Sequence, residues 1–329
     1  MSELNSNGNF ARRWLSFRPE LKVLDCTIRD GGLINNHYFT DDFVRAVYHA
    51  LSKSGVDYME FGYRSSRELY PPEDYGAWKY CDDEKIRQVI DGIESDIKIS
   101  VMVDSYRVKE QQFAPADESP IDMFRAATYV KYIDSAIELI NKCHDLGYET
   151  TCNIMAISKE IEPDLIEALD QLARTPVDVV YVVDSFGALY CEQIEYLVKL
   201  YKEHLPGKTI GIHCHNNQQL AYANTIEGII HDANYVDGSL FGIGRGPGNC
   251  CLELLVGFLK NPKFNLTPIL KVIQDYMIPM RKEIEWGYII PYFVTGILNE
   301  HPRSAIAWRK TEDKDKYAEF YEKMRLPQE

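Results

Sequence analysis

The sequence predicts a (β/α)8 barrel that carries a C-terminal helical extension. Strand and helix patterns alternate from residue 21 to residue 260, and the strand patterns number eight. Strands that alternate with helices form parallel sheets, and eight such units are typical of a closed barrel. A doubly wound open sheet is the alternative, but it rarely carries eight regular units.

The expected strands are short and rich in β-branched or aromatic residues. They are Leu21–Cys26, Val56–Phe61, Ile97–Val103, Met123–Tyr129, Glu149–Met155, Val177–Val183, Thr209–His215 and Tyr235–Leu240. Apolar residues recur between them at helical spacing, over Phe43–Leu51, Ile133–Ile140, Leu165–Ala173, Ile194–Tyr201 and Leu252–Leu259. A further helix near Tyr106–Phe113 has the least regular pattern. Thr40 or Asp41 is expected to cap the first helix, and Gly55 and Gly147 to follow helix ends.

These patterns divide the chain into three parts. Residues 1–20 form an N-terminal segment, residues 21–261 the catalytic barrel, and residues 262–329 a C-terminal extension. The extension contains helical stretches at Ile269–Glu285 and Asp315–Met324. We expect it to pack on the barrel, because the apolar stretch Tyr288–Leu298 needs covering.

Composition excludes several classes of function. The 329 residues are 45% hydrophobic and 26% charged, which is ordinary for a soluble globular protein. The net charge of −14 argues against nucleic acid, which needs a basic face. No signal peptide and no run long enough to span a membrane is seen, so we expect a cytoplasmic protein. Eight cysteines occur without a C-x-x-C pair, and Cys26, Cys152 and Cys214 lie in expected strands, which fits buried thiols.

The segment Gly211-Ile-His-Cys-His-Asn-Asn217 carries the first candidate for chemistry. His213 and His215 are two apart on a strand, so their side chains point to the same face. Asp30 and Arg29 follow the first expected strand, and strands one and seven are separated only by strand eight around a barrel. Functional groups gather at the C-terminal ends of barrel strands. Two histidines and one carboxylate suit a divalent metal with open positions.

Several motifs agree in order with one known superfamily. They are Asp25-Cys-Thr-Ile-Arg-Asp30-Gly-Gly, Asp184-Ser-Phe-Gly-Ala188, His213-Cys-His215-Asn-Asn, and a glycine loop that ends in Gly248-Asn249 with Glu253 after it. On these residues the chain resembles the DRE-TIM metallolyases, a superfamily of aldolases and acyltransferases. Within it the chain is most similar to the 4-hydroxy-2-oxovalerate aldolase-like branch.

The resemblance implies a role for each motif residue. Asp30, His213 and His215 would be metal ligands, and Asn249 is a ligand in some members and a neighbour of the site in others. Arg29 would stabilise an enolate, and Ser185 with its neighbouring backbone amides would hold the substrate carboxylate. The metal expected is Mn²⁺, with Mg²⁺ or Co²⁺ as alternatives. We also expect a homodimer, and a dehydrogenase partner that receives the aldehyde is a possibility the family raises.

Elementary chemistry supports the same assignment. Breaking a C–C bond next to a 2-oxo acid leaves an enolate, on which a divalent metal acts as a Lewis acid. A guanidinium such as Arg29 adds fixed positive charge where negative charge develops. The alternative for Arg29 is a buried structural pair with Asp30 or Asp184. Asp184, at the end of strand six, is a candidate for substrate binding, or for orienting a ligand histidine.

Two loops supply further candidates for substrate binding. The glycine-rich segment Gly242–Asn249 lacks the Lys-Ser/Thr of a P-loop, but barrels often bind phosphate after strands seven and eight. Arg245 is therefore a candidate for a phosphate or carboxylate on the substrate. The long connection Gly62–Tyr80 is interpreted as a substrate wall or lid, with a structural flap or dimer contact as the alternative. Arg64 in it is the candidate that contacts the second substrate.

One position departs from the family pattern. The oxovalerate aldolases have a helpful histidine three residues after the metal aspartate, where this chain has Leu33. His37 is close in sequence and is the candidate base. Tyr292 and His301 are further candidates, for each of which a structural role is the alternative.

The sequence thus predicts a metal-dependent aldolase that joins or cleaves a 2-oxo acid, expected to be pyruvate, and an aldehyde. One rival is a Claisen-type acyl-CoA synthase or lyase of the same superfamily. Cys250 and Cys251 come only after Gly248-Asn249, and the chain is short for a regulatory domain, and both points weigh against this rival. A catalytically silent barrel that acts as a partner protein is the second rival. Intact Arg29, Asp30, His213 and His215 argue against it.

Overall fold

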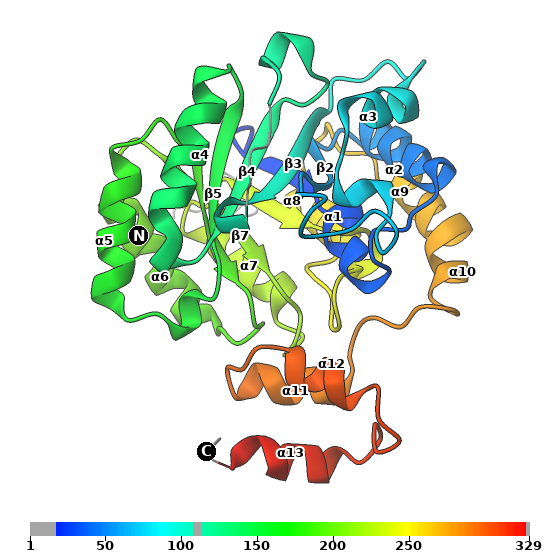
Figure 1. The fold of residues 1–329 in the computed structure, drawn as a ribbon, viewed down its shortest axis with the longest axis vertical. Helices are drawn as coiled ribbons and strands as arrows, with labels where there is room; N and C mark the ends of the chain where they lie inside the picture. Colours follow the sequence, from blue (N-terminus) through cyan, green and yellow to red (C-terminus); the bar gives the residue numbers. More distant parts are fainter. Residues whose placement is uncertain (1–17, 108–112, 327–329) are drawn as a thin grey trace, which may run out of the picture.

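The computed structural model describes residues 18–107 and 113–326, so most of the expected N-terminal segment lies outside it. Eight parallel strands form a closed barrel in chain order, with β1 and β7 on either side of β8 (Figure 1). The predicted fold class is therefore confirmed. The strands are β1 (Lys22–Asp25), β2 (Tyr58–Tyr63), β3 (Lys98–Asp104), β4 (Met123–Thr128), β5 (Glu149–Ile154), β6 (Val179–Asp184), β7 (Thr209–Cys214) and β8 (Tyr235–Gly238).

Helices surround the barrel and connect its strands. They are the short α1 (Thr27–Gly31), α2 (Asp41–Ser54), α3 (Asp83–Ile90), α4 (Ile133–Asp145), α5 (Glu162–Ala173), α6 (Cys191–His204), α7 (Ala221–Ile230) and α8 (Leu252–Leu259). Thr40 caps α2 as predicted, because its hydroxyl accepts a hydrogen bond from the Phe43 N–H at 3.3 Å. Gly55 ends α2 at a φ of 75°, a conformation that favours glycine.

The connection between β3 and β4 departs from the prediction. Its described residues contain only 3₁₀ turns, at Ser105–Arg107 and Ala116–Glu118, while residues 108–112 lie outside the description. The described ends of the expected helix Tyr106–Phe113 are therefore not α-helical. Helix α3 was not predicted, because only Ile86 and Val89 of its eight residues are buried.

The C-terminal region consists of two different parts. Helix α9 (Leu266–Val272), a π-helical turn (Ile273–Met277) and α10 (Ile278–Met280) contribute apolar side chains to the barrel's core, and α9 packs on α2. Helices α11 (Ile290–Ile297), α12 (Arg303–Trp308) and α13 (Tyr317–Arg325) enclose a small core of their own and stand apart from the rest in Figure 1.

Helix α11 is anchored to the end of β7. The Asn217 side-chain amide donates to the Tyr292 carbonyl at 3.0 Å, and a Cβ placed on Gly296 would lie 2.7 Å from the Asn217 Cβ. The last helices are thus held beside the C-terminal ends of the strands.

The described residues also bear on the cysteines and on membranes. All eight cysteines are free, and Cys26, Cys152 and Cys214 are buried, as predicted. Within residues 18–107 and 113–326 no helix combines the length and apolarity that a membrane span requires.

Candidate active site

A cavity of about 380 Å³ opens at the C-terminal ends of the strands. Most of the residues predicted to carry chemistry line it together: Arg29, Asp30, His37, Ser185, His213, His215 and Arg245. They come from α1, the loops after β1, β6 and β8, and strand β7. Fragments far apart in the sequence therefore meet at one place.

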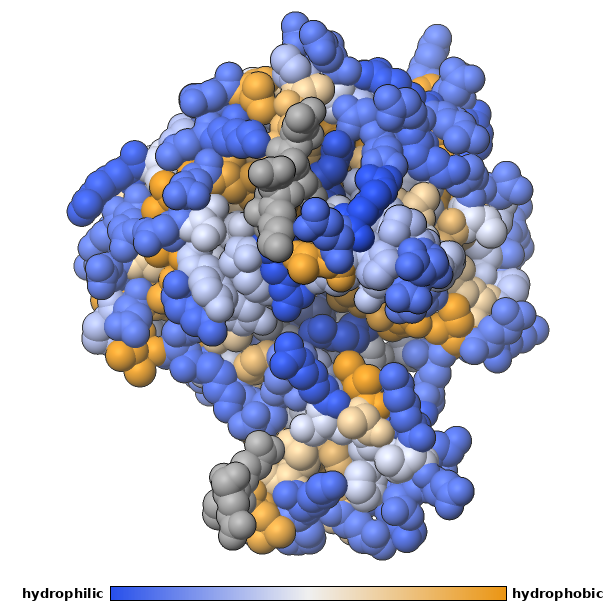
Figure 2. Space-filling view, in the orientation of Figure 1, coloured by the Kyte–Doolittle hydropathy of each residue, from blue (hydrophilic) through white to orange (hydrophobic). Residues whose placement is uncertain are grey.

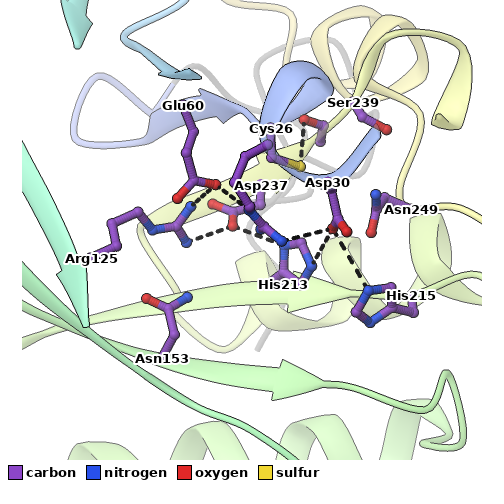
Figure 3. A network of polar contacts seen from close by, with 12 residues as sticks. Cys26, Asp30, Glu60, Arg125, Asn153, His213, His215, Asp237, Ser239 and Asn249 are labelled. Atoms are coloured by element: carbon purple, nitrogen blue, oxygen red, sulfur yellow. Dashed lines mark hydrogen bonds and ion pairs between the residues drawn. The ribbon is translucent and has the colours of Figure 1, made fainter. Parts of the chain in front are cut away.

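The side chains of the two predicted histidine ligands converge on one carboxylate oxygen of the third ligand, Asp30. Asp30 Oδ2 lies 3.3 Å from His213 Nε2 and 3.7 Å from His215 Nε2. The two imidazole rings are 5.0 Å apart between centroids and nearly perpendicular. Asp30 is on α1, directly after β1, while His213 is in β7 and His215 follows it, so the closure of the barrel around β8 brings them together (Figure 3).

The polar atoms at this point fit a divalent cation. Both carboxylate oxygens of Asp30, Nε2 of His213 and Oδ1 of Asn249 are buried and make no hydrogen bond with the described residues, although Arg29 forms an ion pair with Asp30. Asn249 donates its side-chain amide to the Ile243 carbonyl at 3.0 Å, which directs its oxygen the other way, beside Asp30 in Figure 3. Buried lone pairs without donors are costly unless they bind a cation. Asp30, His213, His215 and Asn249 would hold the metal.

The second nitrogen of each histidine is already engaged. His213 Nδ1 lies 2.9 Å from Asp237 Oδ2, and His215 Nδ1 lies 3.1 Å from the Asp184 carbonyl oxygen. Each Nδ1–H can therefore donate, which leaves the Nε2 lone pair facing Asp30. Such contacts fix the tautomer and orientation of metal-binding histidines.

Burial and neighbouring charges shift the pKa of each side chain in the cluster. Burial would raise the pKa of Asp30, but the charge of Arg29 and the contacts with His213 and His215 hold that pKa well below its usual range. Burial lowers the pKa of His215, so its ring is neutral at physiological pH. Burial would also lower the pKa of His213, but Asp237 and Asp30 raise it.

Cys26 lies close to Asp30 and His213, within reach of a shared ion. Its thiol, however, donates to the Gly238 carbonyl at 3.3 Å. Burial raises the pKa of this thiol well above its ordinary value. Only a thiolate is a good metal ligand, so Cys26 is not assigned as one.

A ring of buried ion pairs underlies the cluster (Figure 3). Arg29 contacts Asp30 at 3.1 Å and Glu60 at 2.7 Å. Arg125 continues the ring, because it contacts Glu60 at 3.1 Å and Asp237 at 2.7 Å, and Asp237 contacts His213. These side chains are at most 6% exposed. The geometry supports a pair of Arg29 with Asp30, one of the two structural partners considered, but Arg29 also lines the cavity.

Sequence reasoning missed two members of this ring, Arg125 and Asp237. Each is the one charged residue of its strand, β4 and β8 respectively. A lone charge inside an otherwise apolar or small-residue strand of a barrel was the available signal, since the barrel interior must compensate it.

Two predicted substrate-binding residues do not line the cavity. The Arg64 guanidinium pairs with Asp83 and lies 5.7 Å from the centroid of the Phe124 ring. The structure therefore places Arg64 away from the cavity wall, and its role toward a second substrate stays a prediction. The Asp184 carboxylate accepts the Ala188 N–H at 2.9 Å and so holds the loop after β6. Its carbonyl orients His215, which is the alternative considered for this residue.

Polar groups of the cavity wall are free to meet a substrate. Ser185 Oγ accepts the Ala156 N–H at 2.8 Å, so its hydroxyl proton can be donated elsewhere. Asn153 Oδ1 accepts from Thr151 at 3.0 Å, which leaves its amide N–H groups to donate. Asn153 had not been predicted.

His37 lies in the cavity wall with both ring nitrogens buried and without a hydrogen-bond partner among the described residues. Its ring sits on the backbone at Gly32, where a Cβ would come within 2.0 Å of Nδ1. Burial and the charges of Lys79 and Arg29 lower the pKa of His37 to about 3. The ring is therefore neutral. Leu33 also lines the cavity.

The connection Gly62–Tyr80 forms part of the wall, through Tyr63, Tyr70, Tyr75 and Lys79. It folds back on β2, since a Cβ on Gly62 would lie 1.9 Å from the Trp78 carbonyl oxygen. The buried Trp78 indole donates to the Phe39 carbonyl at 3.1 Å. Of the two C-terminal candidates, His301 lines the cavity. Tyr292 does not line it, and its backbone carbonyl accepts the hydrogen bond from Asn217 that anchors α11.

Comparison with known proteins agrees with this geometry. A family model described as HMGL-like matches residues 20–275. An oxaloacetate decarboxylase of Mycobacterium tuberculosis is 31% identical over 242 residues, which cover 72% of this chain and 69% of that protein. A 4-hydroxy-2-oxovalerate aldolase of Thermus thermophilus is 29% identical over 262 residues, which cover 78% of this chain and 75% of that protein.

Solved structures show the same architecture. The N-terminal domain of a Bacteroides vulgatus protein, described as a candidate aldolase, matches with a TM-score of 0.76 and 27% identity, over 91% of this chain and 100% of that one. The carboxyl transferase domain of Rhizobium etli pyruvate carboxylase matches in fold, with a TM-score of 0.69 and 14% identity, over 93% of this chain and 55% of that one. The chain belongs to the HMGL-like family, the DRE-TIM metallolyases, as its motifs predicted.

Proposed function

We propose that this protein is a divalent-metal-dependent aldolase that joins pyruvate to an aldehyde, or cleaves the product. The observation that carries the proposal is the convergence of buried lone pairs without hydrogen bonds on Asp30, His213 and Asn249, beside the Arg29 guanidinium. The names of the relatives, 4-hydroxy-2-oxovalerate aldolase and oxaloacetate decarboxylase, support carbon–carbon lyase chemistry. A divalent cation, expected to be Mn²⁺, would supply Lewis acidity at the keto oxygen.

In the cleavage direction, the bond between C3 and C4 of the hydroxy-keto acid breaks. Its electron pair moves into the C2–C3 bond, the keto oxygen becomes the enolate oxygen, and C4 becomes the aldehyde carbon as the hydroxyl proton leaves. Arg29 lies where this negative charge develops and stabilises it. Ser185 and Asn153 donate hydrogen bonds to the carboxylate. His37 accepts the hydroxyl proton, and it returns the proton in the joining direction.

Oxaloacetate decarboxylation tests the pyruvate half alone. Loss of CO₂ from oxaloacetate gives the same enolate, but no base has to remove a hydroxyl proton. The presence of Leu33, where the family has histidine, should therefore not affect this reaction. We expect slow decarboxylation that depends on added Mn²⁺ and exceeds two controls, the Arg29→Ala variant and buffer with free Mn²⁺. A wild-type rate equal to both controls would refute the proposal and favour an acyl-CoA substrate.

A further inference from the structure

Two cations face the cavity without an ion-pair partner, although the charge of Asp104 acts on one of them, Lys79. Lys79 is only 5% exposed, and its ammonium lies 4.0 Å from the Tyr70 ring centroid and 4.3 Å from that of Tyr63. Neither this ammonium nor the Arg245 guanidinium makes an ion pair or hydrogen bond with a residue in 18–107 or 113–326. Aromatic rings compensate a buried cation only in part. A negatively charged group of a substrate can therefore supply the ionic partner that both side chains lack.

The described wall of the cavity as a whole carries more basic than acidic side chains, which also favours an anionic ligand. The described lining contains five basic side chains, Arg29, Lys79, Arg107, Arg245 and Arg303, against two acidic ones, Asp30 and Asp104. Arg29 is paired with Asp30 and Glu60, and Arg107 lies 3.9 Å from Asp104. The unmatched positive charge stands out in a chain whose net charge is −14.

Three separate segments bring these cations to the cavity. Lys79 ends the connection after β2, Arg245 lies in the glycine loop after β8, and Arg303 begins α12. Burial, and then the charges of Arg245 and Arg303, lower the pKa of His301 to about 4. Both arginines therefore lie near His301. In Figure 2 the surface is hollowed between the barrel and the C-terminal helices, with hydrophilic residues at its border.

We propose that Lys79, Arg245 and Arg303 form an anion subsite, so that the aldehyde joined to pyruvate carries a carboxylate or a phosphate at its far end. The inference rests on the proposed function. Arg29, Ser185 and the metal ligands hold the 2-oxo acid, so the remaining cations fall to the second substrate. A neutral aldehyde would leave Lys79 and Arg245 buried or half-buried without an ion-pair partner, with Asp104 shared between Lys79 and Arg107.

Oxaloacetate offers a different explanation for the same cations, because it also carries a second carboxylate. Decarboxylation, however, converts that carboxylate into neutral CO₂, and its charge moves to the enolate. A cation beside the leaving group stabilises the ground state more than the transition state and so slows the reaction. The subsite therefore fits an anion that keeps its charge through the reaction.

Pairs of aldehydes that differ in charge test the subsite. Full-length protein loaded with Mn²⁺ is given pyruvate and either succinic semialdehyde or butanal, and either glyceraldehyde 3-phosphate or glyceraldehyde. We expect kcat/KM for the charged member of at least one pair to exceed that for the neutral member by about tenfold or more. The pair that shows the preference identifies carboxylate or phosphate. Equal or higher kcat/KM for both neutral members would overturn the inference.

Variants locate the effect. In Lys79→Met and in Arg245→Met, the ratio of charged to neutral kcat/KM should fall by about tenfold. The two residues lie on different loops, so one variant remains if the other fails to fold. Lys131→Met is the matched control, since Lys131 is exposed near the end of β4 but does not line the cavity, and its ratio should stay within about twofold. An unchanged ratio in both cavity variants would contradict the assignment.

A binding measurement separates this inference from the proposed function. Succinate and glycerol 3-phosphate are titrated into the Mn²⁺-loaded protein in a calorimeter. Binding of either that is lost in Lys79→Met supports the subsite, even if oxaloacetate is not decarboxylated and the aldolase proposal fails. Decarboxylation without any anion binding would overturn the subsite and leave the aldolase proposal standing.

Discussion

The floor and the rim of the cavity compensate their charges in different ways. The floor, which consists of Arg29, Asp30, Glu60, Arg125, His213 and Asp237, is a closed ring of buried contacts between 2.7 and 3.3 Å. The rim, which consists of Lys79, Arg245 and Arg303, comes from loops and the start of α12 and makes no ion pair among the described residues. The one nearby carboxylate of the described lining, Asp104, acts on both Lys79 and Arg107. The floor has buried lone pairs that a metal cation would bind, whereas the rim has basic side chains that an anion would bind. We infer that the floor does the chemistry and the rim selects the second substrate.

The largest effect is expected when the floor loses its metal ligands. Asp30→Asn and His213→Ala should each reduce bound Mn²⁺ below about one-tenth of an ion per chain and abolish activity, because a ligand lost from a small donor set cannot be replaced locally. Metal content is measured by mass spectrometry after dialysis, with circular dichroism to check folding. Cys26→Ser is the matched control and should keep the metal. Full metal content in both ligand variants would place the ion elsewhere.

Next in size is the cost of opening the ring of ion pairs. Arg125→Met leaves Glu60 and Asp237 as buried carboxylates without their shared cation, and should lower the free energy of unfolding by about 3–5 kcal/mol. Urea unfolding measures this change. Arg67→Met removes an exposed pair with Asp82 and should cost about 1 kcal/mol or less. Similar losses in the two variants would mean that the buried ring contributes no special stability.

A smaller effect is expected from exchanging the cation of the floor that faces substrate. Arg29→Lys should keep the metal but lose about 2–4 kcal/mol of transition-state stabilisation, since an ammonium cannot reproduce the planar fork of donors. The ratio of kcat/KM for oxaloacetate in the two proteins gives this value, and metal content is the control. Normal turnover with a full complement of Mn²⁺ would assign Arg29 a purely structural role.

His37 should affect only the aldehyde side of the reaction. His37→Asn, which tolerates the local φ of 62°, should lower kcat for aldol cleavage by about 100-fold. The loss for oxaloacetate should be far smaller, because decarboxylation transfers no hydroxyl proton. Equal losses with both substrates would show that His37 supports the site as a whole and is not the base.

The smallest effect is a pH dependence of the rim. Burial lowers the pKa of Lys79 to about 8, against opposing charge from Asp104, while Arg107, Cys81, His37 and the rings of Tyr63, Tyr70 and Tyr75 also face it. The ammonium predominates below pH 8, so kcat/KM for a charged aldehyde should fall up to about tenfold per pH unit above that value. The neutral aldehyde of the pair is the control. Parallel profiles for both aldehydes would contradict a role of Lys79 in anion binding.

The difference between floor and rim also explains what the sequence could predict. The eight strands were predicted because burial imposes a repeating pattern, and Asp30, His213 and His215 were found because strand ends meet in a barrel. Arg125 and Asp237 were missed because a single charge in a strand resembles an interruption. Lys79 and Arg303 were missed for another reason, since no periodic pattern tells which residue of a long loop or terminal helix turns toward a cavity.

Binding of oxalate tests the account of the floor most directly, because this planar dianion resembles the pyruvate enolate and no aldehyde is needed. Calorimetric titration of the Mn²⁺-loaded protein should show one oxalate per chain, no binding in Asp30→Asn, and an affinity about tenfold or more weaker in Arg29→Ala. Titration of oxalate into free Mn²⁺ is the blank. Oxalate binding that is the same without metal, or unchanged in Arg29→Ala, would contradict the claim that the floor stabilises an enolate.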